Sequence, residues 1–144
     1  MTVLETSRAS ARKRPLRVVF PELGDDERVA EAARILETDG LAHPMGLSDP
    51  TSEQMAALVE ERGMKEAIAK RMLNKPLYRA AAMVAAGEAD VMVAGADSPT
   101  RRVIEAASIA IGLDKGEHML SSSFLMFFPV WPELLFAYFA FNFS

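Results

Sequence analysis

The sequence of 144 residues contains no cysteine and only two histidines, His43 and His118. The lack of cysteine excludes a disulfide framework, a thiolate metal site and a cysteine nucleophile. Two histidines leave little for a histidine-based metal centre or a serine–histidine triad, and neither has a partner that the sequence identifies. We therefore expect no metal site in this chain.

The composition also lacks the extremes that mark disordered, collagen-like or strongly charged chains. Half of the residues are hydrophobic, a quarter are charged, and the net charge is -4. This composition is typical of a soluble, globular protein, and the length corresponds to about one domain. A chain of this size can bury about two thirds of its unfolded surface.

Positive charge is scarce in the body of the chain but concentrated at its start, residues 1–16, which we treat as a basic arm. The basic residues of this region and its immediate boundary are Arg8, Arg12, Lys13, Arg14 and Arg17. Such an arm can bind phosphate or act as an organelle address, but a frayed, solvated terminus is the simpler interpretation. No apolar stretch of the secretory type follows, so we expect a cytoplasmic protein. No aromatic residue lies among these bases to stack on a nucleotide, which argues against nucleic-acid binding.

Alternating apolar patterns over residues 17–123 predict an α/β domain. Short β-branched or apolar runs at residues 17–20 and 91–94 predict strands, the second buried on both sides, and residues 41–47 predict a weaker one. Helical spacing predicts helices between them. Their expected starting residues are Asp25 or Asp26, Thr51 (with a capping box to Gln54), Pro76, and Pro99 with Ser98 as the N-cap. Strands that alternate with helices favour a parallel sheet.

The tail, residues 124–144, breaks this pattern because it holds seven of the eight phenylalanines and the one tryptophan. A run of about 20 apolar residues can span a membrane, but Pro129, Pro132 and Glu133 interrupt this one. A hairpin of two strands, residues 124–128 and 134–141, is the favoured interpretation. Strands this apolar on both faces need a cover, which suggests an incomplete domain or a homo-oligomer.

The first candidate site is the loop at residues 95–100, which follows a predicted strand and leads into a helix. Open α/β sheets bind ligands at the carboxyl ends of their strands, and a helix N-terminus attracts anions. The candidate phosphate-binding residues here are Gly95, Ala96, Ser98, Thr100, Arg101 and Arg102. The alternative is an ordinary capped helix, because neither a P-loop nor a G-x-G-x-x-G motif is present.

The second candidate site is the run of three serines at residues 121–123. Ser122 and Ser123 enter an apolar strand, where their hydroxyl groups could hold phosphate or a carbonyl oxygen. A polar strand entry is the simpler interpretation.

Three blocks of sequence occur in a recognisable order. The first reads RVVFPE, followed by DERV and EAA, over residues 17–33. The second reads GEADVMVAGA over residues 87–96, with Pro99 and Thr100 just beyond, and the third reads IG and then SSFLM between residues 111 and 126. Together they resemble the N-terminal portion of the phosphate acetyltransferase/phosphate butyryltransferase family over about residues 16–129.

The resemblance implies acyl transfer between coenzyme A and inorganic phosphate, with acetyl-CoA and acetyl phosphate as substrates or products. It implies no cofactor, because coenzyme A is itself a substrate. It also implies a fold resembling isocitrate and isopropylmalate dehydrogenases, in which two α/β domains, often dimeric, enclose a cleft. The loop at residues 95–100 and Ser122 and Ser123 would face that cleft.

Several departures from the family qualify these expectations. The chain is less than half the usual length, and the family's catalytic serine, arginine and aspartate lie in the C-terminal half, so no catalytic residue is assigned here. The region around residues 43–55 is short, residues 130–132 differ from the family's turn, and Glu105 stands where many relatives carry an arginine. We therefore expect an incomplete, inactive portion of an acyltransferase. The alternative is a non-catalytic pseudoenzyme or interaction module that binds a partner through its apolar tail.

Overall fold

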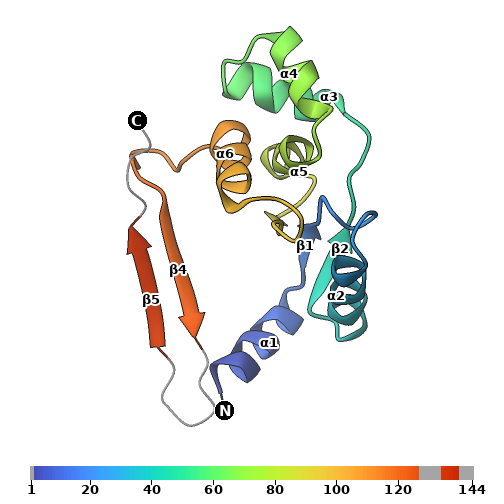
Figure 1. Cartoon of the computed structure of the whole chain (residues 1–144), viewed down its shortest axis with the longest axis vertical. Helices are drawn as coiled ribbons and strands as arrows, with labels where there is room; N and C mark the ends of the chain where they lie inside the picture. Colours follow the sequence, from blue (N-terminus) through green and yellow to red (C-terminus); the bar gives the residue numbers. More distant parts are fainter. Residues whose placement is uncertain (1, 127–133, 140–144) are drawn as a thin grey trace.

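The computed structural model describes residues 2–126 and 134–139 of the chain. The elements in chain order are α1 (Val3–Lys13), β1 (Leu16–Val19), α2 (Glu27–Thr38), β2 (Ala42–Met45), α3 (Ser52–Ala56), the π-helical turn η1 (Ala57–Glu61), α4 (Glu66–Leu73), α5 (Pro76–Ala85), β3 (Val91–Met92), α6 (Thr100–Ala110), β4 (Ser121–Met126) and β5 (Leu134–Phe139). Figure 1 shows their arrangement.

Three of the strands form a parallel sheet in the order β2-β1-β3. Leu16 of β1 lies opposite Ala42 of β2, and Val18 lies opposite Val91 of β3. The predicted α/β class with a parallel sheet is therefore confirmed. Because all three strands run in the same direction, the segments that leave them emerge at one edge of the sheet.

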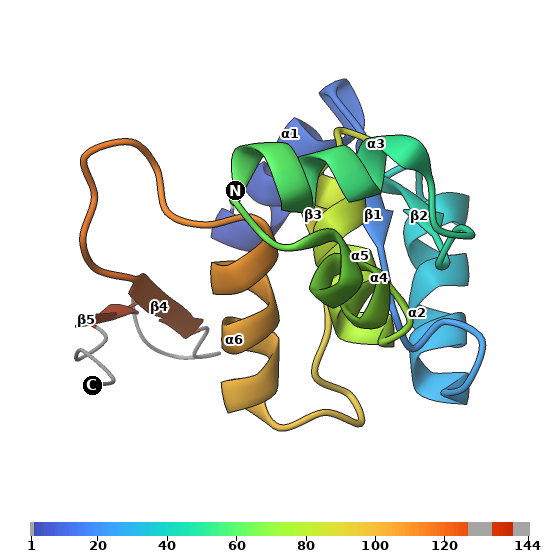
Figure 2. The same ribbon diagram turned by 90° about the horizontal axis from the view of Figure 1, so that it is seen from above.

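The central strand β1 contributes to a core on each face of the sheet, because successive side chains of a strand point to opposite faces. Val18 packs with Val29 and Ala33 of α2, whereas Val19 packs with Ala80 and Met83 of α5. Figure 2 accordingly shows α2 on one side of the strands and α5, with α6 beyond it, on the other. A third cluster joins α5 to η1, α4 and α6 through small and aliphatic side chains.

The basic arm is a helix rather than the frayed terminus that we expected. Thr2 and Glu5 form a complete capping box: the Glu5 N–H donates to Thr2 Oγ1 at 3.2 Å, and the Thr2 N–H donates to Glu5 Oε2 at 2.7 Å. Arg12 Nε also donates to the Asp39 carbonyl at 3.1 Å. The Thr-x-x-Glu spacing was the signal for this helix, and the cluster of basic residues obscured it.

Strand β3 is shorter and more exposed than the sequence predicted. It covers Val91 and Met92, both half-buried, and Val93 keeps 49% of its surface exposed. The reason is its position, because β3 is an edge strand of the described sheet. The apolar run at residues 91–94 predicted the strand correctly but not how deeply it lies.

Strands β4 and β5 pair in antiparallel fashion, with Phe124 opposite Phe136, and β4 begins at Ser121, three residues before the predicted strand. Residues 127–133 and 140–144, which include the predicted turn, lie outside the described residues, so the proposed partner-binding tail stays a prediction. Figures 1 and 2 show the hairpin beside α6, away from the three-stranded sheet. None of the helices in the described ranges combines the length and the hydrophobicity needed to cross a membrane.

Candidate functional site

The segments that follow β1 and β3 meet at the carboxyl edge of the sheet, where Glu22 contacts the loop at residues 95–99. The Gly95 N–H donates to both carboxylate oxygens of Glu22 at 3.3 Å, and the Asp97 N–H donates to Oε1 at 3.1 Å. Glu22 is buried, with 9% of its surface exposed. Gly95 has a φ of +114°, which side-chain-bearing residues rarely adopt, so its backbone can turn toward the carboxylate.

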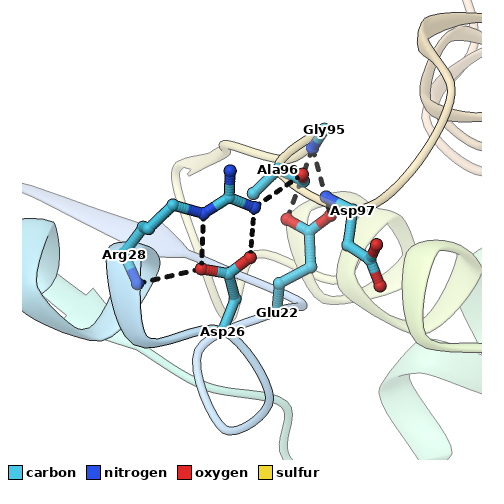
Figure 3. Close-up of polar contacts among 6 residues, drawn as sticks. All are labelled: Glu22, Asp26, Arg28, Gly95, Ala96 and Asp97. Atoms are coloured by element: carbon cyan, nitrogen blue, oxygen red, sulfur yellow. Dashed lines mark hydrogen bonds and ion pairs between the residues drawn. The ribbon is translucent and has the colours of Figure 1, made fainter.

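Arg28 holds the same loop from the start of α2. Its Nη2 donates to the Ala96 carbonyl at 3.0 Å and to Asp26 Oδ2 at 2.6 Å. Asp26 is the N-cap of α2, and the hydrogen bond from the Arg28 side chain lowers the pKa of Asp26 to about 2. Figure 3 shows Glu22 and Arg28 side by side, each directed at the loop.

These contacts occupy backbone groups of the loop that an external anion would otherwise bind. The sequence suggested that backbone N–H groups near Gly95 and Ala96 would cradle a phosphate. In the structure the Gly95 and Asp97 N–H groups already bind the Glu22 carboxylate, and the Ala96 carbonyl binds Arg28. The assignment of Gly95 and Ala96 to phosphate stays a prediction. The other polar donors of this edge are Ser98 and Arg102, which follow residues 95–97 of the loop, and Lys75 and Tyr78 at the start of α5.

Those remaining donors face a pocket of about 490 Å³ between the first turns of α5 and α6. Its lining residues are Lys75, Pro76, Leu77, Tyr78, Ser98, Arg102 and Glu105. The structure therefore brings two predicted site residues, Ser98 and Arg102, together with three polar residues that sequence reasoning did not select. The Lys-Pro sequence at the start of α5 could have indicated these residues, because it marks a helix N-terminus. A helix that connects two parallel strands begins at the carboxyl edge of the sheet, where the pocket lies.

Both helices present their N-termini without a side-chain cap. The N-cap of α6 is Pro99 and that of α5 is Lys75, and neither side chain caps its helix. The prediction that Ser98 is the N-cap of α6 is wrong, because the helix begins one residue later and Ser98 lines the pocket instead. Uncapped first turns carry free N–H groups and the positive end of the helix dipole, which attract an anion.

The charges in the pocket are mixed. Lys75 Nζ lies 5.5 Å from the centre of the Tyr78 ring, within cation–π range. The Tyr78 hydroxyl donates to Glu105 Oε1 at 3.1 Å. Burial and then the Glu105 carboxylate raise the pKa of Tyr78, while Arg102 acts in the opposite direction. Two cations, two hydroxyl groups and one carboxylate thus face one cavity, a set that can hold a phosphate at its cationic side.

The other predicted site residues lie elsewhere. Thr100 and Arg101 are exposed at the start of α6 and do not line the pocket. Ser122 and Ser123 are exposed on β4, and Figure 2 shows α6 between β4 and α5. In the described ranges no three histidine, aspartate or glutamate side chains gather as a metal ion would require.

Comparison with known proteins gives a consistent result. A family model described as phosphate acetyl/butaryl transferase matches residues 46–144. A phosphate acetyltransferase of Paracoccus denitrificans is 33% identical over 144 residues, which cover 88% of this chain and 45% of that protein. A phosphate acetyltransferase of Acetivibrio thermocellus is 29% identical over 74% of this chain and 33% of its own length. The chain thus spans half or less of the length of these relatives.

Solved structures agree in fold. The crystal structure of a phosphotransacetylase from Streptococcus pyogenes superposes with a TM-score of 0.80 at 26% identity, and the match covers 92% of this chain and 49% of that one. A phosphotransacetylase from Staphylococcus aureus gives a TM-score of 0.76 at 23% identity.

Proposed function

The chain belongs to the phosphate acetyl/butaryl transferase family, and we propose that it takes part in moving an acetyl or other acyl group between coenzyme A and inorganic phosphate. The family match over residues 46–144 supports this reaction class. The observation that carries the proposal for this chain is the pocket that Lys75, Ser98 and Arg102 line at the uncapped N-termini of α5 and α6.

The chemistry of the reaction requires such a site. A thiolate attacks the carbonyl carbon of an acyl phosphate, the carbon–oxygen bond to phosphate breaks, and a thioester and inorganic phosphate remain. Cations and N–H donors that hold the phosphate stabilise the leaving group, and they must be fixed before the reaction begins. We assign Lys75, Ser98, Arg102 and the helix N–H groups to phosphate binding, and we assign no catalytic residue.

The further features of the family enter as parts of the same proposal. We infer that the acyl-transfer centre lies in the part of the relatives that this chain does not match, so that residues 1–144 bind ligand without turnover. We also propose the dehydrogenase-like architecture of two α/β domains, a cytoplasmic location and self-association. The partial coverage of the relatives supports the first of these inferences.

The test is calorimetric titration of the chain with acetyl phosphate and with coenzyme A. We expect dissociation constants of roughly millimolar size, because a partial cleft is poorly preorganised. The double variant Lys75→Met, Arg102→Met should lose most of the binding. Lys70→Met, Arg71→Met is the matched control, because it removes the same charge from exposed positions on α4. Equal loss in both variants, or none in either, would show that the pocket is not the binding site.

A further inference from the structure

We propose that Glu22 is a positioning residue: its carboxylate is a built-in anion that fixes the loop between β3 and α6 and so directs Ser98 and Arg102 into the pocket. The predicted effect on phosphate binding rests on the proposed function. The restraint of the loop by Glu22 does not depend on that function. Glu22 does not line the pocket and acts through the loop.

The strongest support is the number and kind of bonds that Glu22 receives. Both of its oxygens accept from the Gly95 N–H, and Oε1 also accepts from the Asp97 N–H. Hydrogen bonds to an ionised acceptor are roughly twice as strong as neutral ones. Because the carboxylate is buried, water competes poorly for these bonds. The loop is therefore fixed at two alternate residues by one side chain.

Arg28 adds a second restraint between those two positions. It bonds the Ala96 carbonyl, so three consecutive residues of the loop are tied to the segment between β1 and α2. Its side chain is 75% exposed, which makes this bond weaker than those of Glu22. Figure 3 shows the two restraints converging on the loop from one side.

The consequence for the pocket follows from chain connectivity. Ser98 comes directly after Asp97, and α6 begins at Thr100, with Arg102 in its first turn. A change in the position of Asp97 therefore moves a hydroxyl, a guanidinium group and the helix N–H groups together. Misplacement of several donors weakens binding even when each donor is still present.

Two rival roles for Glu22 predict that phosphate binding becomes stronger, not weaker, when the charge of Glu22 is removed. If Glu22 acted on phosphate only through its negative charge, its neutralisation would strengthen anion binding. If Glu22 competed with phosphate for the loop, its neutralisation would free the Gly95 and Asp97 N–H groups and would again strengthen binding. A positioning role alone predicts weaker binding once the charge is removed.

The experiment compares Glu22→Gln with Glu27→Gln in the full chain, because Glu27 is an exposed acid on α2 and its change removes the same charge. Without ligand, amide hydrogen exchange at Gly95 and Asp97 should be about tenfold faster in Glu22→Gln and unchanged in Glu27→Gln. A change of about tenfold is the size expected when a hydrogen bond to a charged group is weakened. Titration with inorganic phosphate, followed by amide NMR, should show binding about three- to tenfold weaker in that variant. Glu27→Gln should bind at least as well as the unmodified chain.

Unchanged exchange at Gly95 and Asp97 would overturn the loop restraint, and stronger phosphate binding by Glu22→Gln would overturn the positioning role. Failure of the unmodified chain to bind phosphate would instead refute the proposed function, while the exchange rates still decide whether Glu22 restrains the loop.

If Glu22→Gln does not fold, Glu22→Asp is the second variant, because it keeps the charge but has a shorter side chain. A positioning role predicts weaker binding by that variant, and wild-type binding would contradict it.

Discussion

At the scale of single residues, Glu105 sets the balance of charge in the pocket. It places a carboxylate in a cavity that also holds Lys75 and Arg102, and the Tyr78 hydroxyl donates to it. Because like charges repel, we expect an anion to bind on the side of the pocket that Lys75, Ser98 and Arg102 form.

The Tyr78 hydroxyl reports this arrangement through its pKa. Burial and the Glu105 carboxylate both disfavour the phenolate and raise the pKa of Tyr78. Glu105→Gln should lower that pKa, but not fully, because the burial persists. The chain has two tyrosines, so a Tyr138→Phe background lets phenolate absorbance follow Tyr78 alone during a pH titration. A Tyr78 pKa that is unchanged or higher in Glu105→Gln would show that the two groups do not interact in solution.

At the scale of elements, the two ends of α6 differ: a side chain caps its C-terminus, but none caps its N-terminus. Arg62 donates from Nε to the Ile109 carbonyl at 3.0 Å and from Nη2 to the Ser108 carbonyl at 3.1 Å. Gly112 then ends the helix region with a φ of +80°. A cation at the C-terminus satisfies the last carbonyls and stabilises the helix dipole. The first turn has no such side-chain partner, which leaves its positive end available at the pocket.

Substitution of Gly112 tests this C-terminal arrangement. Gly112→Ala places a methyl group in a left-handed backbone conformation and against the Arg62 guanidinium, so Arg62 must move. We expect a loss of about 1–2 kcal/mol in the free energy of unfolding, measured by urea denaturation. Gly24→Ala is the control, because it meets open space without a positive φ and should change stability by less than about 0.5 kcal/mol. Equal effects of the two changes would contradict the account of the α6 terminus.

The elements also show what the sequence could and could not predict. Local signals predicted that Asp25 or Asp26 opens α2 and that Thr51 opens α3, and the structure has Asp26 and Thr51 as the N-caps of these helices. The predicted start of α5 at Pro76 is also observed. At Thr51 only half of the predicted capping box forms, because the Gln54 amide donates to Ser48 and Glu88 instead. The bond to Glu88 joins residues 34 positions apart, so no local sequence pattern could have predicted it.

The same limit applies to the candidate site. Ser98 and Arg102 were selected as candidates because they follow a strand and begin a helix. Lys75 and Tyr78 were missed because they belong to α5, which reaches the pocket only through the crossover connection of the sheet. The contact between Glu22 and the loop joins residues 73 and 75 positions apart, so the sequence suggested an open anion site where the chain supplies its own carboxylate.

At the scale of the whole molecule, the parallel sheet gathers the loop, its Glu22 restraint and the first turns of α5 and α6 at one edge. The match to the Streptococcus pyogenes phosphotransacetylase structure covers 92% of this chain and 49% of that one. The central claim is that this edge binds the phosphate of an acyl phosphate or of coenzyme A in the pocket between α5 and α6.

The most direct test of that claim is an amide NMR titration of the unmodified chain with inorganic phosphate. Saturable shifts should appear at residues 75–78 and 98–102, and the binding should weaken as salt is added, because a charge-driven contact near the surface is screened. The basic helix α1 is the competing site, since Arg8, Arg12, Lys13 and Arg14 gather there. Shifts centred on α1, with residues 75–78 and 98–102 unaffected, would contradict the account.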